Sequence, residues 1–445
     1  LNQSGTLIFR ATRVGEATLL AQIIASVRQA QSSKPPIAKL ADQVAAVFVP
    51  SVLIIAVLTA LAWFNFGPEP RLGYMLVTSL TVLIIACPCA LGLATPISIM
   101  IGVGKAAEYG ILIRDGAALQ RAGQMTTVVL DKTGTVTLGR PAVTTVIAAP
   151  GFNETELFRL AAGVEAGSEH PLARAIVDAA RERGLDLPAV SEFAAINGQG
   201  AVGQVEQRQV RIGNRRLLEQ GGIDPTPLLA DMERLAGQGQ TPVLAAIDDR
   251  LAGLLAVADP IKPDSIAALA RLRDLGLRLV LLTGDHAVTA RAIAAQVGID
   301  EVFAEVLPLD KAGVIAQLQA GGAVVGMVGD GINDAPALAQ ADVGLAIGAG
   351  TDIAIESAGM TLVRGSLHGI ADAIALSRAT LINIRQNLVG AFLYNTLGIP
   401  IAAGILYPLT GLLLNPMLAG AAMALSSFTV VSNANRLRRF RPTAR

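Results

Sequence analysis

Four long apolar stretches limit what this chain can fold into more than any other feature. They lie at about 44–64, 76–103, 388–406 and 412–431. Each is long enough to cross a bilayer, whose hydrocarbon core of about 30 Å needs about 20 helical residues. The composition agrees, because 52% of the 445 residues are hydrophobic and only 16% are charged. These values predict a multi-pass α-helical membrane domain in contact with the lipid bilayer.

A polar block at about 105–385 separates the two pairs of apolar stretches and carries most of the charge. Short apolar runs alternate with helical patterns along it, which is typical of a soluble α/β domain. The tail at 436–445 is rich in arginine, so the positive-inside rule predicts that the tail and the block are cytosolic. We expect a plasma-membrane protein. Its 35 basic residues balance its 35 acidic residues, so net charge gives no reason to expect nucleic acid as a partner.

Three aspartates follow apolar runs of the strand type within the polar block. Asp131 follows 127–130 directly, Asp330 follows the run that ends at 328, and Asp285 follows 278–282. In a parallel sheet the carboxyl ends of the strands meet at one edge, so these carboxylates are expected to converge. Carboxylates without histidine suit Mg²⁺, and Mg²⁺ suits a phosphate substrate. Each aspartate alone is as well explained as a helix cap, but three together are not.

The residues from Asp131 to Thr137, DKTGTVT, closely resemble the phosphorylation motif of P-type ATPases. Thr-Gly-Asp at 283–285 and GDGINDAP at 329–336 are similar to two further motifs of that family, in the same order. Asp259-Pro260 resembles the pair at its hinge. The resemblance implies a cytosolic α/β haloacid-dehalogenase-like (Rossmann-type) phosphorylation domain with an inserted α+β nucleotide-binding domain. It also implies ATP and Mg²⁺ as cofactors.

The resemblance assigns a role to each residue around Asp131. Asp131 would attack the γ-phosphate of ATP and form an aspartyl phosphate. Mg²⁺ would be held by Asp131, Thr133 and Asp330. Lys311 would neutralise developing charge, although a lone lysine is more often a solvated surface residue. The implied catalytic set is Asp131, Lys132, Thr133, Thr283, Gly284, Asp285, Lys311, Asn333 and Asp334.

About 120 residues separate Asp131 from Asp259, far more than one crossover between strands needs, so an inserted domain is expected there. The segment SEHPL at 168–172 resembles the nucleotide-binding motif of the heavy-metal subgroup. A lone histidine before proline is more often a cap, and a lone glycine is more often a turn residue. As an ordered set, the implied ATP-binding residues are Glu165, His170, Gly198, Gly200 and Asn214.

The resemblance divides the chain into an ordered series of domains. These are an actuator-domain remnant at 1–20, the first pair of spans at 21–104, the phosphorylation domain at 105–140 and 256–380, the nucleotide-binding domain at 141–255, the second pair of spans at 381–435 and a basic tail at 436–445. The resemblance begins near the end of the family's actuator domain. This point lies after the Thr-Gly-Glu loop that promotes hydrolysis of the aspartyl phosphate in that family. We therefore expect a fragment that forms the phosphoenzyme but turns over slowly.

Cys87-Pro88-Cys89 interrupts the second apolar stretch. Two cysteines this close are expected to remain a dithiol rather than a disulfide, and Pro88 is expected to break the helical hydrogen bonding. Soft thiolates favour Cu(I), although Zn²⁺ also accepts sulfur. The alternative is that two small cysteines simply pack inside a helix.

The last two apolar stretches discriminate between metals. Tyr394 with Asn395, and Met423 with Ser426, are similar to patterns of copper(I)-transporting ATPases, whereas zinc-type relatives place a lysine and an aspartate there. We therefore predict ATP-driven export of Cu(I), with Ag(I) as a mimic and a copper chaperone as a candidate partner. A zinc, cadmium or lead pump is the main alternative, and Met423 alone also fits simple packing. A soluble phosphatase and a passive metal-binding membrane protein are the two alternatives from other classes.

Overall fold

The computed structural model describes residues 36–168, 170–196, 198–330, 334–348 and 357–442. The chain forms two compact units. The first, here the membrane unit, comprises 1–125, 358–365 and 369–445, and the second, the catalytic unit, comprises 126–357 and 366–368. The predicted actuator remnant at 1–20 lies outside the described residues.

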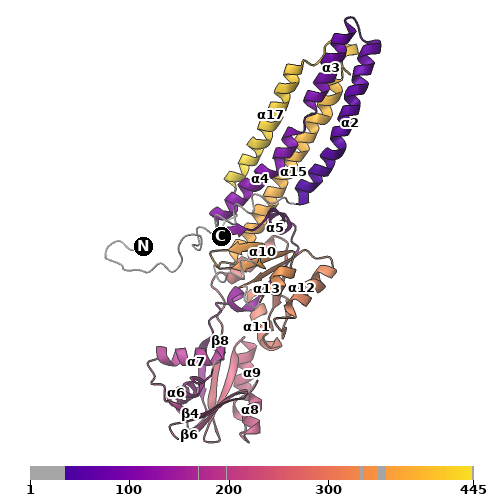
Figure 1. Cartoon of the computed structure of the whole chain (residues 1–445). Helices are drawn as coiled ribbons and strands as arrows, with labels where there is room; N and C mark the ends of the chain where they lie inside the picture. The colour runs from indigo at the N-terminus through magenta and orange to yellow at the C-terminus, as the bar shows by residue number, and fades with distance from the viewer. Residues whose placement is uncertain (1–35, 169, 197, 331–333, 349–356, 443–445) are drawn as a thin grey trace, which may run out of the picture. The chain divides into compact units, whose positions relative to one another are not determined.

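The membrane unit is built on long apolar helices that lie side by side (Figure 1). They are α2 (Pro36–Phe66), α3 (Arg71–Ile85), α4 (Cys89–Glu108), α15 (His368–Ala402) and α17 (Pro416–Asn435), with the short α16 (Tyr407–Thr410) and the 3-10 turn η4 (Arg436–Arg439). The same unit contains α5 (Gly116–Ala122) and the antiparallel pair β1 (Ile111–Ile113) and β13 (Met360–Leu362).

Among the described residues, three helical segments are long and apolar enough to cross a membrane: Pro36–Phe66, Arg71–Glu108 and Pro416–Arg439. They contain three of the four predicted spans. The predicted span at 388–406 overlaps α15, which is not in this group although it has 35 residues. The amide side chains and other polar groups along α15 lower its mean hydropathy, so its crossing of the membrane stays a prediction.

The membrane helices expose apolar side chains on one side and bury small or polar ones on the other. Ile54 and Leu58 of α2 are 61% and 59% exposed, as expected for contact with lipid. Val52, Ala56 and Val82 belong to a buried cluster shared by α2, α3, α15 and α17. The buried hydroxyl of Thr81 donates to the carbonyl of Val77 in its own helix, so this polar group is satisfied without water.

The catalytic unit contains five parallel strands in the order β12-β11-β2-β9-β10. Their bounds are β2 (Thr127–Asp131), β9 (Arg278–Leu282), β10 (Glu301–Phe303), β11 (Val325–Gly329) and β12 (Val343–Ile347). The helices of this part are α10 (Ser265–Asp274), α11 (Ala287–Val297), α12 (Lys311–Ala320) and α13 (Ala335–Gln340). The three apolar runs that precede the aspartates therefore form the adjacent strands β11, β2 and β9, which confirms the predicted convergence.

A six-stranded antiparallel sheet is inserted between β2 and β9, in the order β3-β8-β7-β6-β5-β4. Its strands are β3 (Ala142–Ala148), β4 (Val190–Ile196), β5 (Gly200–Val205), β6 (Arg208–Gly213), β7 (Thr241–Ile247) and β8 (Arg250–Ala258). Its helices are α6 (Glu154–Glu165), α7 (Pro171–Glu182), α8 (Arg215–Gln220) and α9 (Leu229–Gly237), with the 3-10 turn η3 (Thr226–Leu228). Alternate residues of β7 enter two separate cores: Val243 and Ala245 join one, and Leu244 and Ala246 join the other.

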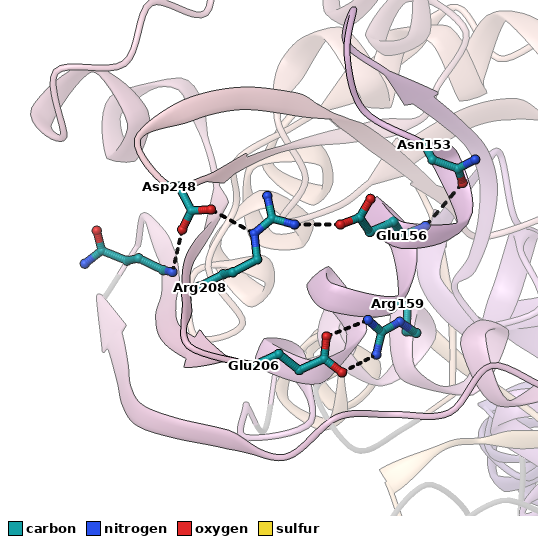
Figure 2. Close-up of polar contacts among 7 residues, drawn as sticks. Asn153, Glu156, Arg159, Glu206, Arg208 and Asp248 are labelled. Carbon is teal, nitrogen blue, oxygen red and sulfur yellow. Dashed lines mark hydrogen bonds and ion pairs between the residues drawn. The ribbon is translucent and has the colours of Figure 1, made fainter.

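Ion pairs tie two hairpins of the inserted domain to α6 (Figure 2). Arg208 donates to Glu156 at 2.6 Å and to Asp248 at 2.8 Å, so one guanidinium joins α6, β6 and the β7–β8 turn. Arg159 and Glu206 form a two-bonded pair at 2.7 Å for each bond. Both hairpin turns use residues with positive φ that match the strand twist, including Glu206 and Asp248.

Candidate active site and ion-binding residues

Asp131 is the last residue of β2, and its side chain is 8% exposed. The loop after it turns sharply because Gly134 has φ of +73°, a conformation that favours glycine. The backbone amide of Thr137 donates to the carbonyl of Lys132 at 3.0 Å and closes the loop. The nucleophile candidate is thus held on a buried strand end with a fixed loop behind it.

Lys311, the first residue of α12, links two carboxylates that are far apart in sequence. Its ammonium group donates to Asp131 Oδ1 and to Asp334 Oδ1, each at 2.5 Å. All three side chains are buried. Burial raises the pKa of Asp131 to about 7, with the charge of Asp334 adding to the effect against the opposing pull of Lys311. Burial lowers the pKa of Lys311, but the two carboxylates outweigh it and the net pKa is raised.

The Thr-Gly-Asp segment lies at the end of the neighbouring strand β9. The backbone amide of Asp285 donates to the Thr283 hydroxyl at 3.1 Å, and Gly284 lies between these two residues. Lys132 donates to Asp285 Oδ2 at 2.6 Å, so the residue after the nucleophile is fixed to this segment. Asn333, also predicted for the site, lies outside the described residues.

An oxygen-rich site beside Asp131 fits a Mg²⁺ ion. A Cβ atom on Gly134 would lie 3.1 Å from Asp330 Oδ2, so the Asp330 carboxylate closely approaches the loop that follows Asp131. Asp330 also raises the pKa of Asp131, and this repulsion between carboxylates is what a bound cation relieves. No group of three or more acidic, histidine or cysteine side chains could hold a metal ion among the described residues. Mg²⁺ needs only one or two carboxylates because it retains several waters.

Lys262 is a residue near the site that the sequence did not single out. Its ammonium group donates to the carbonyl of Gly134 at 2.7 Å, and burial lowers its pKa. The nearby Asp259, predicted at the hinge, accepts from the Thr137 hydroxyl at 2.5 Å and from the Arg140 amide at 3.0 Å. Both residues therefore fix the phosphorylation loop. The only sequence signal for Lys262 was its position two residues after Asp259-Pro260.

The five predicted nucleotide-binding residues all line one cavity of about 630 Å³ in the inserted domain, and they are Glu165, His170, Gly198, Gly200 and Asn214. Burial raises the pKa of Glu165 to about 7, although a hydrogen bond from Ser168 opposes this. His170 Nδ1 accepts the amide of Leu172 at 3.2 Å and caps α7. The neutral ring therefore carries its proton on Nε2, which makes that atom a donor.

A second cavity of about 720 Å³ continues from the first toward the phosphorylation loop. The two cavities share His170, Leu172, Thr241 and Pro242 in their walls. The second cavity is also lined by residues of the predicted phosphorylation site, namely Lys132, Thr133, Asp259 and Asp285. The two cavities are therefore adjacent.

The cysteine pair lies at the break between α3 and α4, and its predicted free dithiol is wrong for this structure. Pro88 interrupts the helix, as predicted, and stands at the N-cap of α4. Because the chain turns there, the Cα atoms of Cys87 and Cys89 are 5.5 Å apart, a separation that a disulfide spans, and the two sulfurs are bonded. Reduction is required before either sulfur can bind a metal as a thiolate.

The other predicted metal ligands lie in two groups. Met423 and Cys87 contact the same buried cluster between the helices. Tyr394 and Ser426 instead line a separate cavity of about 250 Å³. Asn395 is 5% exposed, and its side-chain oxygen has no hydrogen-bond partner among the described residues. The six residues are thus in one helix bundle, but they do not share a single cavity.

Comparison with known proteins agrees with this geometry. Residues 125–342 match the haloacid dehalogenase-like hydrolase family. A copper-exporting P-type ATPase of Vibrio cholerae is 55% identical over 98% of this chain and 48% of that protein. A silver exporting P-type ATPase of Salmonella typhimurium is 51% identical over 99% of this chain and 54% of that protein. The chain therefore spans about half the length of the curated relatives it matches.

A crystal structure of a zinc-transporting PIB-type ATPase in the E2.Pi state is similar over 95% of this chain and 68% of that one, with a TM-score of 0.78 and 36% identity. Fold and site together define a haloacid dehalogenase-like hydrolase unit in one chain with long apolar helices. The chain belongs to the P-type ATPases, in their PIB-type group. This membership removes the soluble phosphatase from the alternatives.

Proposed function

We propose that the protein exports Cu(I), and also Ag(I), in a cycle driven by ATP through an aspartyl phosphate on Asp131. The observation that carries the proposal is the buried contact of Asp131 with Lys311 and Asp334 at the carboxyl edge of the sheet. The relatives named for copper and silver export support the choice of ions. The membrane in question is the plasma membrane, with a copper chaperone as the candidate supplier of the ion.

The proposed phosphoryl transfer uses the side chains around Asp131. A carboxylate oxygen of Asp131 forms a bond to the γ-phosphorus of ATP while the bond from that phosphorus to the bridging oxygen breaks, and ADP leaves. Lys311 and the Thr283 hydroxyl donate hydrogen bonds to the phosphoryl oxygens as their charge develops. Mg²⁺ would be held by Asp131, Asp330 and Thr133 and would supply charge neutralisation. Lys132 and Lys262 hold the loop.

The ion assignment rests on the charge of the spans. No charged residue occurs in α17, or in α15 from residue 388 to Ala402. Reduced Cys87 and Cys89, with the thioether of Met423, form a soft set that suits a monovalent ion without a further carboxylate. A divalent ion such as Zn²⁺ needs an anionic partner that these two segments lack.

Acid-stable phosphoenzyme formation from γ-labelled ATP tests both the chemistry and the ion. We expect hydroxylamine-sensitive label with Cu(I) or Ag(I) in the presence of a reductant, and none in the Asp131→Asn variant. Asp231→Asn, at a half-buried position of α9 where Asp231 pairs with Arg234, is the matched control and should label normally. Label in Asp131→Asn contradicts the assigned nucleophile, whereas label with Zn²⁺ alone contradicts the assigned ion.

A further inference from the structure

The C-terminal ends of α4 and α17 carry basic side chains that the proposed transport cycle does not use. The two helices lie side by side, and the turn η4 contacts both of them (Figure 1). Leu437 of η4 is buried in a small apolar cluster with Ile101 of α4 and Ala434 of α17. The basic turn is therefore anchored to the helix pair.

A second anchor lies at the other end of this turn. The hydroxyl of Tyr109, the residue after α4, donates to the carbonyl of Phe440 at 3.2 Å. The rings of Tyr109 and Phe440 meet edge to face, with 6.5 Å between their centroids. Leu437 and Phe440 thus hold the backbone on both sides of Arg438 and Arg439.

Five exposed arginines surround these anchors, and together they are called the arginine patch here. Arg364 reaches the same place from a distant part of the chain, because a Cβ atom on Gly110 would lie 3.1 Å from its Cγ atom. The members of the patch are Arg364, Arg436, Arg438, Arg439 and Arg441.

The charge of the arginine patch is not balanced by neighbouring carboxylates. No acidic residue occurs in the sequence from 430 to 442. Glu108, close to Tyr109 in sequence, pairs with Lys105 at 2.7 Å. Arg436 donates to the side-chain oxygen of Asn433 at 3.0 Å, which is a neutral partner. In the part of the chain that the structure describes, none of the five arginines forms an ion pair with a carboxylate.

The arginine patch follows directly after the lipid-facing part of both helices. Phe428 of α17 is 68% exposed and Met100 of α4 is 48% exposed, as side chains in contact with lipid are. At about 1.5 Å per residue, Arg436 lies about 12 Å beyond Phe428, and Tyr109 lies about 13 Å beyond Met100. Tyrosine and basic side chains at the end of a span are typical of the headgroup layer.

We propose that the arginine patch binds the headgroup phosphate of an anionic phospholipid in the cytosolic leaflet. Guanidinium groups bind phosphate oxygens in pairs, and a basic cluster beside a membrane span attracts anionic lipids. The acyl chains of the lipid have exposed apolar side chains of α17 to contact. Because the two anchors fix the backbone, less conformational entropy is lost when the arginines gather around one phosphate. This site goes beyond the proposed export, since it needs neither ATP nor the transported ion.

Lipid retention by the full chain in detergent, counted by native mass spectrometry, tests the site. The probes are dioleoyl phosphatidylglycerol and dioleoyl phosphatidylcholine, which have the same acyl chains but differ in net charge. We expect the parent to bind the anionic lipid at least about tenfold more tightly than the zwitterionic one. This preference should fall below about threefold in a variant that keeps Arg436 and combines Arg364→Gln, Arg438→Gln, Arg439→Gln and Arg441→Gln.

Two further variants separate the site from net charge and from misfolding. Lysine at the same four positions keeps the charge and should retain the preference to within about threefold. The matched control neutralises four exposed arginines of the catalytic unit, by Arg181→Gln, Arg215→Gln, Arg216→Gln and Arg291→Gln, and should behave like the parent. An unchanged preference in the variant of the patch, or an equal loss in the control, overturns the proposal.

The source of the phosphate is tested by competition. Soluble sn-glycerol 3-phosphate has the same phosphate chemistry but no acyl chains. At the same concentration it should leave the bound phosphatidylglycerol in place, because it cannot contact the apolar surface of α17. Displacement of the lipid by this compound would mean that the patch binds free phosphate esters, and it would overturn the assignment to a lipid.

Discussion

At the scale of single residues, Lys311 is the group on which the phosphorylation site depends most. It is the shared cation of Asp131 and Asp334, and all three side chains are buried. Removing one partner of a buried ion pair leaves uncompensated charge, which costs about 3–5 kcal/mol. The same removal takes away a donor aimed at the developing phosphoryl charge.

Lys311→Met is therefore expected to lower the free energy of unfolding by about 3 kcal/mol and the phosphorylation rate by about 100-fold or more. Urea unfolding and single-turnover labelling measure the two effects. Adding Asp334→Asn to Lys311→Met should restore much of the stability, because one buried charge is removed, but not the rate. Recovery of both together would mean that Lys311 acts only on stability.

Glu165 predicts a pH dependence of stability. Burial raises its pKa to about 7 in the folded protein, above the ordinary value of 4.5. The folded state thus favours the protonated carboxyl group. The contribution of Glu165 to the free energy of unfolding is therefore complete below pH 4.5 and is lost as the pH rises through 7.

Glu165→Gln, which cannot ionise, should gain stability over the parent between pH 5 and pH 8 by up to about 3 kcal/mol. Thermal unfolding at a series of pH values without nucleotide measures the difference. Glu219→Gln, on the exposed side of α8, serves as the control and should show no such trend. A constant difference between Glu165→Gln and the parent at all pH values contradicts the buried titration.

At the scale of elements, two glycines near the start of β5 have different roles. One allows the close approach of β6, and the other has open space around it. A Cβ atom on Gly200, which has φ of +148°, would lie 2.2 Å from the Ile212 carbonyl oxygen of β6. Gly198 has φ of +70°, but a Cβ atom there would meet nothing within 4 Å. Both glycines line the nucleotide cavity.

Gly200→Ala should therefore separate β5 from β6 and weaken ATP binding by at least about tenfold, whereas Gly198→Ala should cost about 1 kcal/mol of backbone strain. Nucleotide titration and urea unfolding measure both variants. If the two variants weaken ATP binding equally, the close approach of β5 and β6 is not what shapes the cavity.

At the scale of the molecule, the inserted domain is expected to fold by itself. It has its own two cores, and its first and last strands, β3 and β8, are hydrogen-bonded neighbours, so the two ends of the insertion lie close together. The segment 138–258, expressed alone, should unfold in one cooperative urea transition and bind ATP. A broad transition without cooperativity would mean that the rest of the catalytic unit is needed.

The sequence alone determined the features that are local along the chain. Three of the four apolar stretches lie in helices long and apolar enough to cross a membrane, the three runs before Asp131, Asp285 and Asp330 form strands of one parallel sheet as predicted, and Pro88 breaks the helix. The motif around His170 selected residues that line one cavity. These predictions succeeded because hydrophobic patterns, proline geometry and short motifs act over a few residues.

Tertiary structure decided which distant groups meet. Lys311 contacts Asp131 across 180 residues of sequence, and Lys262 fixes the carbonyl of Gly134 across 128 residues. The fold also joined the two cysteines and separated Met423 from the cavity of Tyr394 and Ser426. Such contacts depend on how helices and strands pack, on which faces are buried and on where the backbone turns. That information is distributed over the whole chain, so no single motif contains it.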